Sequence, residues 1–388
     1  MKKIRRLILL NQMAGQLFRE LAEGLAPHYL DGCLLLTGHP DTLKMQGHLP
    51  ENLKVESAPG YDRRTMTRRA FSWLKYLFVT TRLILGAKKS DGFLIVSNPP
   101  ILGGWFWLLN KLHRRPYAVL VYDIYPDILV MMGVITENNP IVKVWHWMNR
   151  KVYRDAVAVI TLGRHMAARL TRNYPFGKKW LYVIPPWVDV EQIKPMSYGE
   201  NPLLKSFNPD GKKVILYSGN MGLSHEIDSM LEAAKLLRGR KDLLFLFIGG
   251  GEKWQLAADF SKRHNLSDVK VHPFQPEKLL PMTMSLATIS LVALEVGAEE
   301  LMVPSKLFYY MAAGSAVVGI CQGENELRDI IDDNESPLTA LKRGKNSSMW
   351  KSIESQKVKI SDITLSAGNT GALLVMSRMI LKTLEGID

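Results

Sequence analysis

The chain has 388 residues, of which 47% are hydrophobic and 22% charged, and 50 Lys and Arg against 37 Asp and Glu give a formal net charge of +13. This composition excludes a disordered or fibrous protein and is sufficient for two domains with their own cores. The two cysteines, Cys33 and Cys321, lie far apart, which excludes a disulfide framework and a cysteine-based zinc site and favours a reducing, cytoplasmic setting.

The first apolar run, residues 7–10, follows a basic start. It is too short for the apolar core of a secretory leader, so we expect a first strand there. The longest apolar runs, such as residues 101–109, fall short of the roughly 20 residues needed to cross a bilayer. We therefore expect a protein that does not span a membrane by itself.

Short apolar strands, each followed by a turn and a helical pattern, recur along the chain in two series. The first comprises residues 4–10, 33–37, 92–96, 117–122 and 156–160, and the second comprises residues 214–218, 243–248, 269–271, 287–293 and 316–320. This alternation is typical of parallel α/β sheets, and it predicts two Rossmann-like domains facing each other across a cleft.

Prolines mark the boundary between the two series. We expect a first domain over residues 1–185, a proline-rich linker over 186–210 and a second domain over 211–360, because proline breaks helices and cannot donate to a sheet. The last segment, residues 361–388, carries a helical pattern at about 371–384, and we expect a helix there that can pack back onto the first domain.

The positive charge is concentrated in the first half of the chain. Residues 1–200 hold 28 Lys and Arg against 15 Asp and Glu, whereas residues 201–388 hold 22 of each. The densest cluster contains Arg63, Arg64, Arg68 and Arg69 and leads into an aromatic stretch with Trp73. Basic residues beside aromatic ones favour an anionic membrane surface, and the alternative is a solvated charge run next to a core helix.

Two places in the first half follow apolar strands and are candidates for contact with a substrate. Gly15, with Gln16 beside it, follows the first strand and leaves the backbone accessible to a ligand. Asp123 and Asp127 follow the strand at 117–122, where carboxylates would face a cleft. Aspartates at such positions also cap helices, and that alternative stays open.

The second half contains three candidate ligand-binding segments, each at a strand end or a helix start. Glycines at a strand-to-helix turn let the backbone approach a ligand, and a helix start offers free N–H groups to a phosphate. The segments are Gly219, Asn220 and Gly222 in the first turn, Gly249, Gly250 and Glu252 in the second, and Pro304, Ser305, Lys306 and Leu307 at the start of a later helix.

Several signatures of other chemistry do not occur in the sequence. It has no Gly-x-x-x-x-Gly-Lys-Ser/Thr loop, no His-x-x-x-His pair and no Gly-x-Ser-x-Gly elbow, and its nine histidines are scattered. Neither glycine turn reads Gly-x-Gly-x-x-Gly, which argues against a dinucleotide dehydrogenase. We expect no metal and no cofactor.

In their order and spacing, these segments resemble the retaining glycosyltransferases of family 4, which have the GT-B architecture, and in particular the branch that assembles bacterial capsule, O-antigen and exopolysaccharide. The resemblance covers residues 12 to about 333. It is carried by residues 12–21, Ser97-Asn98-Pro99-Pro100, Asp123-Ile124-Tyr125-Pro126-Asp127, residues 183–189, Tyr217-Ser218-Gly219-Asn220-Met221-Gly222, Val303-Pro304-Ser305-Lys306-Leu307 and Met311-Ala312-Ala313-Gly314.

The resemblance implies a UDP- or GDP-sugar donor bound by the second domain and a polyprenyl-diphosphate-linked saccharide acceptor bound by the first. It also implies retention through same-face attack assisted by the departing phosphate, with Asp123 orienting or deprotonating the acceptor. The sequence departs from the family at its paired glutamates, which would fall at Leu301 and Tyr309, and at a basic residue after the Gly-Asn turn, where His225 and Glu226 occur.

This interpretation places the protein in the cytoplasm, peripheral on the inner face of the cell membrane, with no nucleic acid as partner. Two alternatives remain open. A nucleotide-sugar 2-epimerase has the same architecture and would act without an acceptor. A non-catalytic protein would use the basic half to bind anionic lipid or nucleic acid, with a steep dependence on salt.

Overall fold

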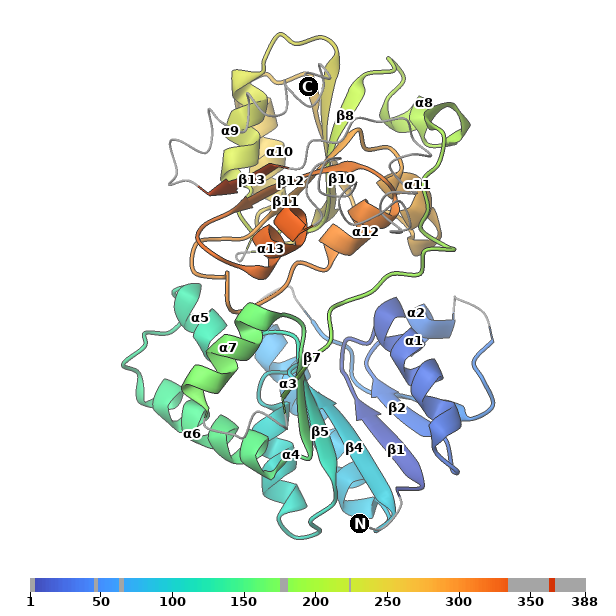
Figure 1. The fold of residues 1–388 in the computed structure, drawn as a ribbon, viewed down its shortest axis with the longest axis vertical. Helices are drawn as coiled ribbons and strands as arrows, with labels where there is room; N and C mark the ends of the chain where they lie inside the picture. The colour runs from blue at the N-terminus through green and yellow to red at the C-terminus, as the bar shows by residue number, and fades with distance from the viewer. Residues whose placement is uncertain are drawn as a thin grey trace. The chain divides into compact units, whose positions relative to one another are not determined.

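The computed structural model describes residues 4–44, 48–62, 66–174, 181–222, 225–333 and 363–366. The chain divides into two compact units, Met1–Pro185 and Pro186–Asp388. In Figure 1 each unit contains a sheet with helices packed against it. Within the described ranges, no helix combines the length and the apolar character needed to cross a bilayer.

The first unit contains a seven-stranded sheet in the order β3-β2-β1-β4-β5-β6-β7, in which all neighbours are parallel. Apolar side chains fill both faces of the central strands, as a sheet covered by helices on both sides requires. The strands are β1 (Arg6–Leu10), β2 (Cys33–Thr37), β3 (Leu53–Ser57), β4 (Asp91–Val96), β5 (Tyr117–Val121), β6 (Ala158–Thr161) and β7 (Leu181–Val183).

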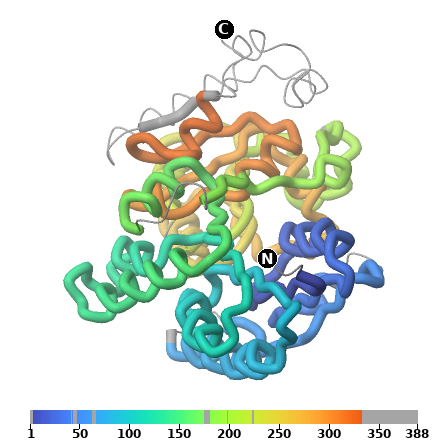
Figure 2. Tube along the Cα trace, turned by 60° about the horizontal axis from the view of Figure 1, so that its bottom comes forward, coloured from blue at the N-terminus to red at the C-terminus, as the bar shows by residue number. Residues whose placement is uncertain are grey.

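Helices α3, α4 and α6 of the first unit pack in that order, with α4 in the middle. The tube in Figure 2 shows the same part of the chain from another side. The helices of this unit are α1 (Gln16–Leu25), α2 (Pro40–Lys44), α3 (Met66–Gly86), α4 (Leu102–Asn110), α5 (Asp127–Met131), α6 (Pro140–Asp155) and α7 (Arg164–Asn173), with a 3-10 turn η1 (Ala26–His28).

The second unit contains a six-stranded parallel sheet in the order β10-β9-β8-β11-β12-β13. Its strands are β8 (Lys213–Asn220), β9 (Leu243–Gly250), β10 (Val269–Pro273), β11 (Ile289–Ala293), β12 (Ala316–Cys321) and β13 (Ile363–Ser366). In both sheets the strand order reverses beside the first strand, and ligands of such sheets bind outside the carboxyl ends of the strands at that point.

The helices of the second unit bury Met230, Leu231 and Ala257 against the sheet in one apolar core. They are α8 (Leu204–Phe207), α9 (Asp228–Leu236), α10 (Trp254–Arg263), α11 (Leu280–Met284), α12 (Lys306–Ala312) and α13 (Glu326–Asp333), with 3-10 turns η3 (Tyr198–Glu200) and η4 (Glu277–Leu279).

The predicted α/β class with two Rossmann-like sheets is confirmed, and every strand of the two predicted series is present. The sequence pattern missed β3, β7 and β13, because these edge strands are short and β3 carries few apolar residues. The helix expected at residues 371–384 lies outside the described residues. Within 361–388, the described residues 363–366 form β13, which pairs with β12.

Candidate functional site

A pocket of about 470 Å³ opens at the carboxyl ends of β8 and β9 in the second unit. One part of its lining is apolar and contains Phe274, Pro276 and Leu280. Lys306 adds a cation to the lining. The remaining lining residues are Ser218, Gly219, Asn220, His225, Ile248, Gln275, Glu277, Thr283, Met284, Met302, Val303, Pro304, Ser305 and Tyr309. An apolar pocket with a few convergent polar groups is typical of a ligand site.

The glycines at the ends of β8 and β9 allow the two strand ends to pack main chain against main chain. A Cβ atom added at Gly249 would lie 1.8 Å from the carbonyl oxygen of Gly219, and one at Gly251 would lie 2.7 Å from Oδ1 of Asn220. Met221 donates its N–H to the carbonyl of Gly250 at 2.6 Å. Glycine is therefore required here by close approach, which explains the three consecutive glycines.

Lys306, the first residue of α12, directs its ammonium group toward the end of β8. Its Nζ donates to the hydroxyl of Tyr217 and lies 4.0 Å from the centre of that ring. Burial lowers the pKa of Lys306 to about 7. An anion bound in this pocket would favour the charged ammonium and raise that pKa again.

His225 is buried in the same pocket and is neutral. Burial is the main cause that lowers its pKa to about 2, and the positive charges of Lys306 and Lys253 add to it. Lys253 donates to the carbonyl of His225 at 2.9 Å and to the carboxylate of Glu295 at 2.7 Å. Lys253 therefore places a second positive charge next to the main chain of His225, where it pairs with Glu295.

Gly15 and Gln16 lie at the start of α1, directly after the turn that follows β1. Gly15 is exposed, and a Cβ atom added to it would meet nothing within 4 Å. Its carbonyl accepts from the N–H groups of Phe18 and Arg19, at 3.1 and 3.0 Å. Gly15 is therefore accessible at the start of α1, and its expected contact with an acceptor stays a prediction.

Asp123 follows β5 at the same edge of the first sheet. The hydroxyl of Ser97, which follows β4, accepts from the N–H groups of Tyr122 and Asp123 at 3.0 and 3.3 Å. Burial raises the pKa of the Asp123 carboxyl to about 6. A carboxylate with this pKa is suited to accept a proton near neutral pH.

Asp127 has a different environment from Asp123. Its Oδ1 accepts from Arg169 Nη2 at 2.6 Å, from Arg169 Nε at 3.1 Å and from Asn173 Nδ2 at 3.1 Å, so it ties the start of α5 to α7. His146 Nε2 lies 3.8 Å from its Oδ2. The side chain is buried and has a structural role within the unit, and its expected contact with an acceptor stays a prediction.

Each of the two units matches a known protein-family model. Residues 14–187 match the model described as Glycosyl transferase 4-like domain, and residues 203–341 match that of Glycosyl transferases group 1. Both units are glycosyltransferase domains. A third match, residues 324–388, is to the model described as Fatty acid synthesis protein.

The curated relatives include glycosyltransferases and phosphate acyltransferases. The chain is 27% identical over 274 residues to the probable glycosyltransferase WbjE of Pseudomonas aeruginosa, which is 70% of this chain and 67% of WbjE. It is 29% identical over 151 residues to the putative colanic acid biosynthesis glycosyl transferase WcaI of Escherichia coli, which is 38% of this chain and 37% of WcaI. A segment of 61 residues, 16% of this chain, is 57% identical to a phosphate acyltransferase of Pelagibacter ubique and spans 18% of that protein.

Solved structures with a similar fold include two proteins of the GT-B type. Anabaena HepE in complex with UDP-glucose has a TM-score of 0.60 at 13% identity, over 98% of this chain and 100% of HepE. Sucrose-phosphate synthase from Thermosynechococcus elongatus has a TM-score of 0.62 at 13% identity, over 99% of this chain and 100% of that one. These likenesses establish the fold of the glycosyltransferase units.

The predicted donor residues of the second glycosyltransferase unit fall into two groups. Gly219, Asn220, Pro304, Ser305 and Lys306 line the pocket. The others, Gly222, Gly249, Gly250, Glu252 and Leu307, do not line it. Leu307 is fully buried in the core, because its position on α12 faces the sheet, and its expected contact with the donor stays a prediction.

The other glycines belong to the turns beneath the pocket. A Cβ atom at Gly222 would lie 2.8 Å from Asn220 Nδ2 and 3.5 Å from Glu252 Oε2, and one at Gly250 would lie 3.0 Å from the ring of Phe274. Their small size therefore sets the positions of Asn220, Glu252 and Phe274, and their role in donor binding stays a prediction.

Sequence reasoning missed several residues around this pocket. The hydroxyl of Tyr310 accepts from the N–H of Ser218 at 2.7 Å and donates to its carbonyl at 3.1 Å, which fixes the end of β8. Tyr309, where the family carries an acidic residue, lines the pocket with its side chain. The helical spacing of Lys306, Tyr309 and Tyr310 was the available signal, because residues three and four apart on a helix lie close together.

The basic cluster of the first glycosyltransferase unit is described in part. Arg63 and Arg64 lie outside the described residues, Arg68 is exposed, and Arg69 and Trp73 are half-buried. The Trp73 ring stacks on Tyr61 at 6.2 Å and 7°, and the Arg69 guanidinium lies 5.8 Å from the centre of the Tyr61 ring. The Trp73 ring therefore packs against its own unit, and its expected place at a membrane surface stays a prediction.

Other side chains of α3 are exposed instead. Phe71, Leu74 and Phe78 are 59, 58 and 62% exposed, at spacings that place them on one helix face. Lys75 and Arg82 lie over the Phe71 and Phe78 rings, 4.6 and 4.8 Å from their centres. An apolar face flanked by cations is typical of a helix that lies on an anionic membrane.

Within the described residues, no group of three or more His, Cys, Asp and Glu side chains is arranged to hold a metal ion. The expectation that the enzyme needs neither metal nor cofactor stays a prediction.

Proposed function

We propose that the protein transfers a sugar, with retention of configuration, from a UDP- or GDP-sugar to a lipid-carried saccharide during the assembly of a cell-surface polysaccharide. The observation that carries the proposal is the pocket of the second glycosyltransferase unit, which combines main-chain groups of two strand ends with the ammonium of Lys306. HepE, which has the same fold, is in complex with UDP-glucose, and WcaI is named for colanic acid biosynthesis.

The pocket has an apolar part and a positively charged part, and this combination suits a nucleoside diphosphate. Phe274 is 56% exposed, and its ring, with Pro276 and Leu280, offers an apolar surface for a base. Lys306 and the glycine turn lie at the strand ends, where a diphosphate would be held. As the glycosidic bond breaks, negative charge develops on the diphosphate, and the lysine would stabilise it.

We expect the Lys306→Ala variant to bind a nucleoside diphosphate about tenfold to a hundredfold more weakly than the wild type, since a charge-assisted hydrogen bond contributes about 1.5–3 kcal/mol. Isothermal titration calorimetry with UDP and with GDP measures the loss and identifies the preferred base. The Lys241→Gln variant is the matched control, because this exposed lysine of the same unit is absent from the pocket lining. Equal affinity in K306A and the wild type would remove the lysine from the donor site.

The first glycosyltransferase unit supplies the acceptor side of the proposal. Asp123 would orient the acceptor hydroxyl and take its proton, while the open backbone at Gly15 and Gln16 would contact the acceptor's phosphate or sugar hydroxyls. The acceptor we propose is a polyprenyl-diphosphate-linked saccharide, which is anionic and membrane-embedded and therefore matches the basic charge of this half of the chain.

We further propose that the first unit attaches to the inner face of the cell membrane through the exposed face of α3. Replacing Phe71 and Phe78 with serine should lower binding to anionic vesicles by about tenfold or more, because burying one such ring contributes about 1.5–3 kcal/mol. Vesicle co-sedimentation measures the change. A Leu30→Ser variant, which removes a 69% exposed leucine elsewhere on the unit, should bind as the wild type does. Unchanged binding of the double variant would refute this surface.

A further inference from the structure

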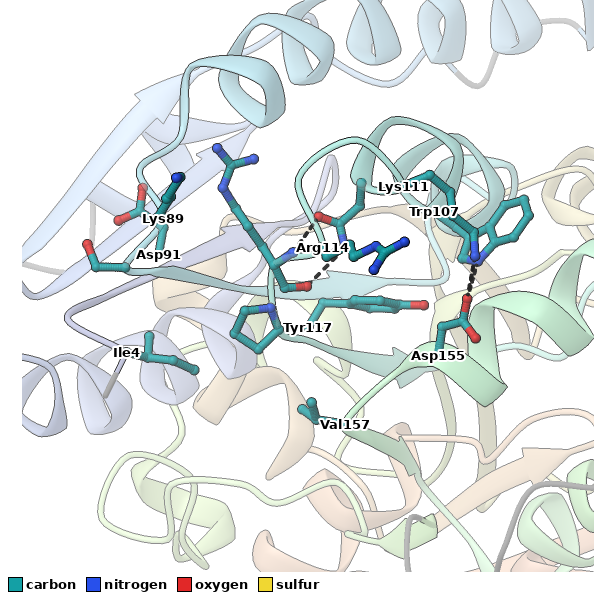
Figure 3. A pocket seen from close by; sticks show the side chains of 13 residues that line it. Ile4, Lys89, Asp91, Trp107, Lys111, Arg114, Tyr117, Asp155 and Val157 are labelled. Atoms are coloured by element: carbon teal, nitrogen blue, oxygen red, sulfur yellow. Dashed lines mark hydrogen bonds and ion pairs between the residues drawn. The ribbon is translucent and has the colours of Figure 1, made fainter. Parts of the chain in front are cut away.

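The first unit contains another pocket, of about 650 Å³, at the amino ends of its strands. It lies at the start of β4, β5 and β6, whereas Gly15 and Asp123 lie at the carboxyl ends of their strands. In Figure 3, Lys89 and Asp91 stand at one side of the pocket, Trp107 and Asp155 at the other, and Lys111 and Arg114 between them. Its other lining residues are Ile4, Ser90, Asn110, Arg115, Pro116, Tyr117 and Val157.

Both carboxylates of this pocket are already neutralised. Asp91 accepts from Arg6 at 2.7 Å and from the N–H of Lys88 at 2.8 Å. Asp155 has three donors, which are Trp107 Nε1 at 2.8 Å, Arg154 Nε at 2.9 Å and Lys111 Nζ at 3.0 Å. Neither carboxylate is therefore available to a further cation without loss of an existing contact.

Two cations of the pocket remain available to a ligand. Arg115 donates its guanidinium to the carbonyls of Ile84, Ala87 and Lys88. Lys89 and Arg114, by contrast, are exposed, and no carboxylate of the described chain pairs with either. The pocket therefore has a surplus of positive charge that the protein itself does not balance.

The backbone at Arg114 offers a way to remove its side chain without disturbing the turn. Its φ of 49° is in the left-handed region, which costs a residue with a Cβ free energy and which glycine adopts freely. The side chain of Asn110 holds this turn by accepting from the N–H of Arg115 at 3.0 Å and donating to its carbonyl at 2.9 Å. A glycine would fit this turn more easily, so replacing Arg114 with glycine removes the guanidinium without adding backbone strain.

Exposed leucines directly follow two of the lining residues at the end of α4. Leu108 and Leu112 are 55 and 77% exposed, beside Trp107 and Lys111 of the pocket itself. Helix α4 packs next to α3, whose exposed apolar face is described above. A ligand with an anionic group and an apolar part would therefore find partners for both.

We propose that this pocket binds a phosphate group through Lys89 and Arg114. Phosphate is suited to the site because a guanidinium and an ammonium that line the same pocket can both donate to its oxygens. The phosphate can come from the head group of an anionic lipid, whose chains would lie along Leu108 and Leu112, or from a free phosphate. The proposal does not depend on the proposed sugar transfer.

The test uses the full chain and compares the wild type with Arg114→Gly, Lys89→Gln and the double variant. Each single variant should bind about fivefold more weakly and the double variant about 25-fold, if two near-surface cations contribute independently. Arg114→Gly should keep or raise the unfolding temperature, since glycine accepts the left-handed backbone. Lys54→Gln is the matched control, because Lys54 is an exposed lysine on β3 that does not line the pocket.

Two probes distinguish the sources of the phosphate. Inorganic phosphate is titrated by calorimetry, and vesicles of phosphatidylcholine with phosphatidic acid are compared with vesicles given equal surface charge by oleate. Loss of phosphate binding in the variants supports a free anion, and loss of phosphatidic acid binding without loss of oleate binding supports a lipid head group. Equal binding by all variants, or an equal loss on both kinds of vesicle without phosphate binding in solution, overturns the proposal.

Discussion

Replacement of Asp123 with asparagine should lower the turnover of sugar transfer by about 10² to 10⁴, which is the usual contribution of a positioned general base. The amide keeps the shape of the side chain and cannot take a proton. The main-chain contacts of this turn, in which Tyr122 and Asp123 donate to Ser97, do not involve the carboxylate and should persist. A transfer assay with donor and lipid acceptor measures the loss, and donor affinity should be unchanged.

The raised pKa of Asp123 predicts how both activity and stability depend on pH. Burial raises that pKa to about 6, so kcat/KM should rise with pH through about 6 as the carboxylate forms. The contribution of this carboxyl to the free energy of unfolding changes in the opposite direction and falls as pH rises. A carboxyl with a raised pKa in the folded state stabilises the fold below its unfolded pKa of about 4, and this contribution is lost as pH rises through about 6.

Asp123→Asn should therefore unfold at a higher denaturant concentration than the wild type at pH 8, and the difference should shrink toward pH 4. Because the side chain is half-buried, we expect a gain of about 1 kcal/mol, less than the full shift would give. Glu51→Gln, which removes an exposed charge from the same unit, should change neither activity nor stability. An active D123N enzyme would show that another group takes the proton.

Local pattern was sufficient for the ten strands of the two predicted series and for the glycine turns. The apolar strand at 243–248 and the glycines after it could be read from the sequence, because buried strands and close backbone contacts restrict which residues are tolerated. Lys306 could be identified as a ligand candidate from the sequence as well. It lies at the start of a helix that follows a proline, where free N–H groups and a cation can meet a phosphate. The cleft expected between the two domains stays a prediction.

Partners that are distant in sequence were not predictable. Asp127 is bound by Arg169 and Asn173, more than 40 positions away, and nothing in the local pattern distinguishes it from Asp123. Trp73 likewise stacks on Tyr61, 12 positions away, and its place beside the basic cluster does not indicate that contact. Pairings of this kind depend on which helices the fold brings together.

The end of the chain differs from the rest in its relatives. The match to Glycosyl transferases group 1 ends at residue 341, while the match to Fatty acid synthesis protein begins at residue 324. Strand β13 lies within the latter segment and extends the sheet of the glycosyltransferase unit beside β12. The sequence pattern predicted a helix at about 371–384 in this segment and did not indicate its match to the model described as Fatty acid synthesis protein.

Gly249→Ala should be the most damaging single change in the second unit. The new methyl group would lie 1.8 Å from the carbonyl oxygen of Gly219, and both atoms belong to main chain that β8 and β9 hold in register. Neither can move without breaking the sheet, so we expect a loss of about 3 kcal/mol or more in the free energy of unfolding. Donor affinity should fall as well, because the Gly219 turn lines the pocket.

Gly239→Ala separates the two reasons for needing glycine. Gly239 has a φ of 96°, yet a Cβ atom there would meet nothing within 4 Å, so its alanine variant carries only backbone strain, about 1 kcal/mol. Chemical denaturation of both variants, with UDP titrated into each, compares strain alone with strain plus collision. If G249A were no less stable than G239A and bound donor normally, the strand ends would have room to separate, and the tight main-chain contact would not be what shapes the donor pocket.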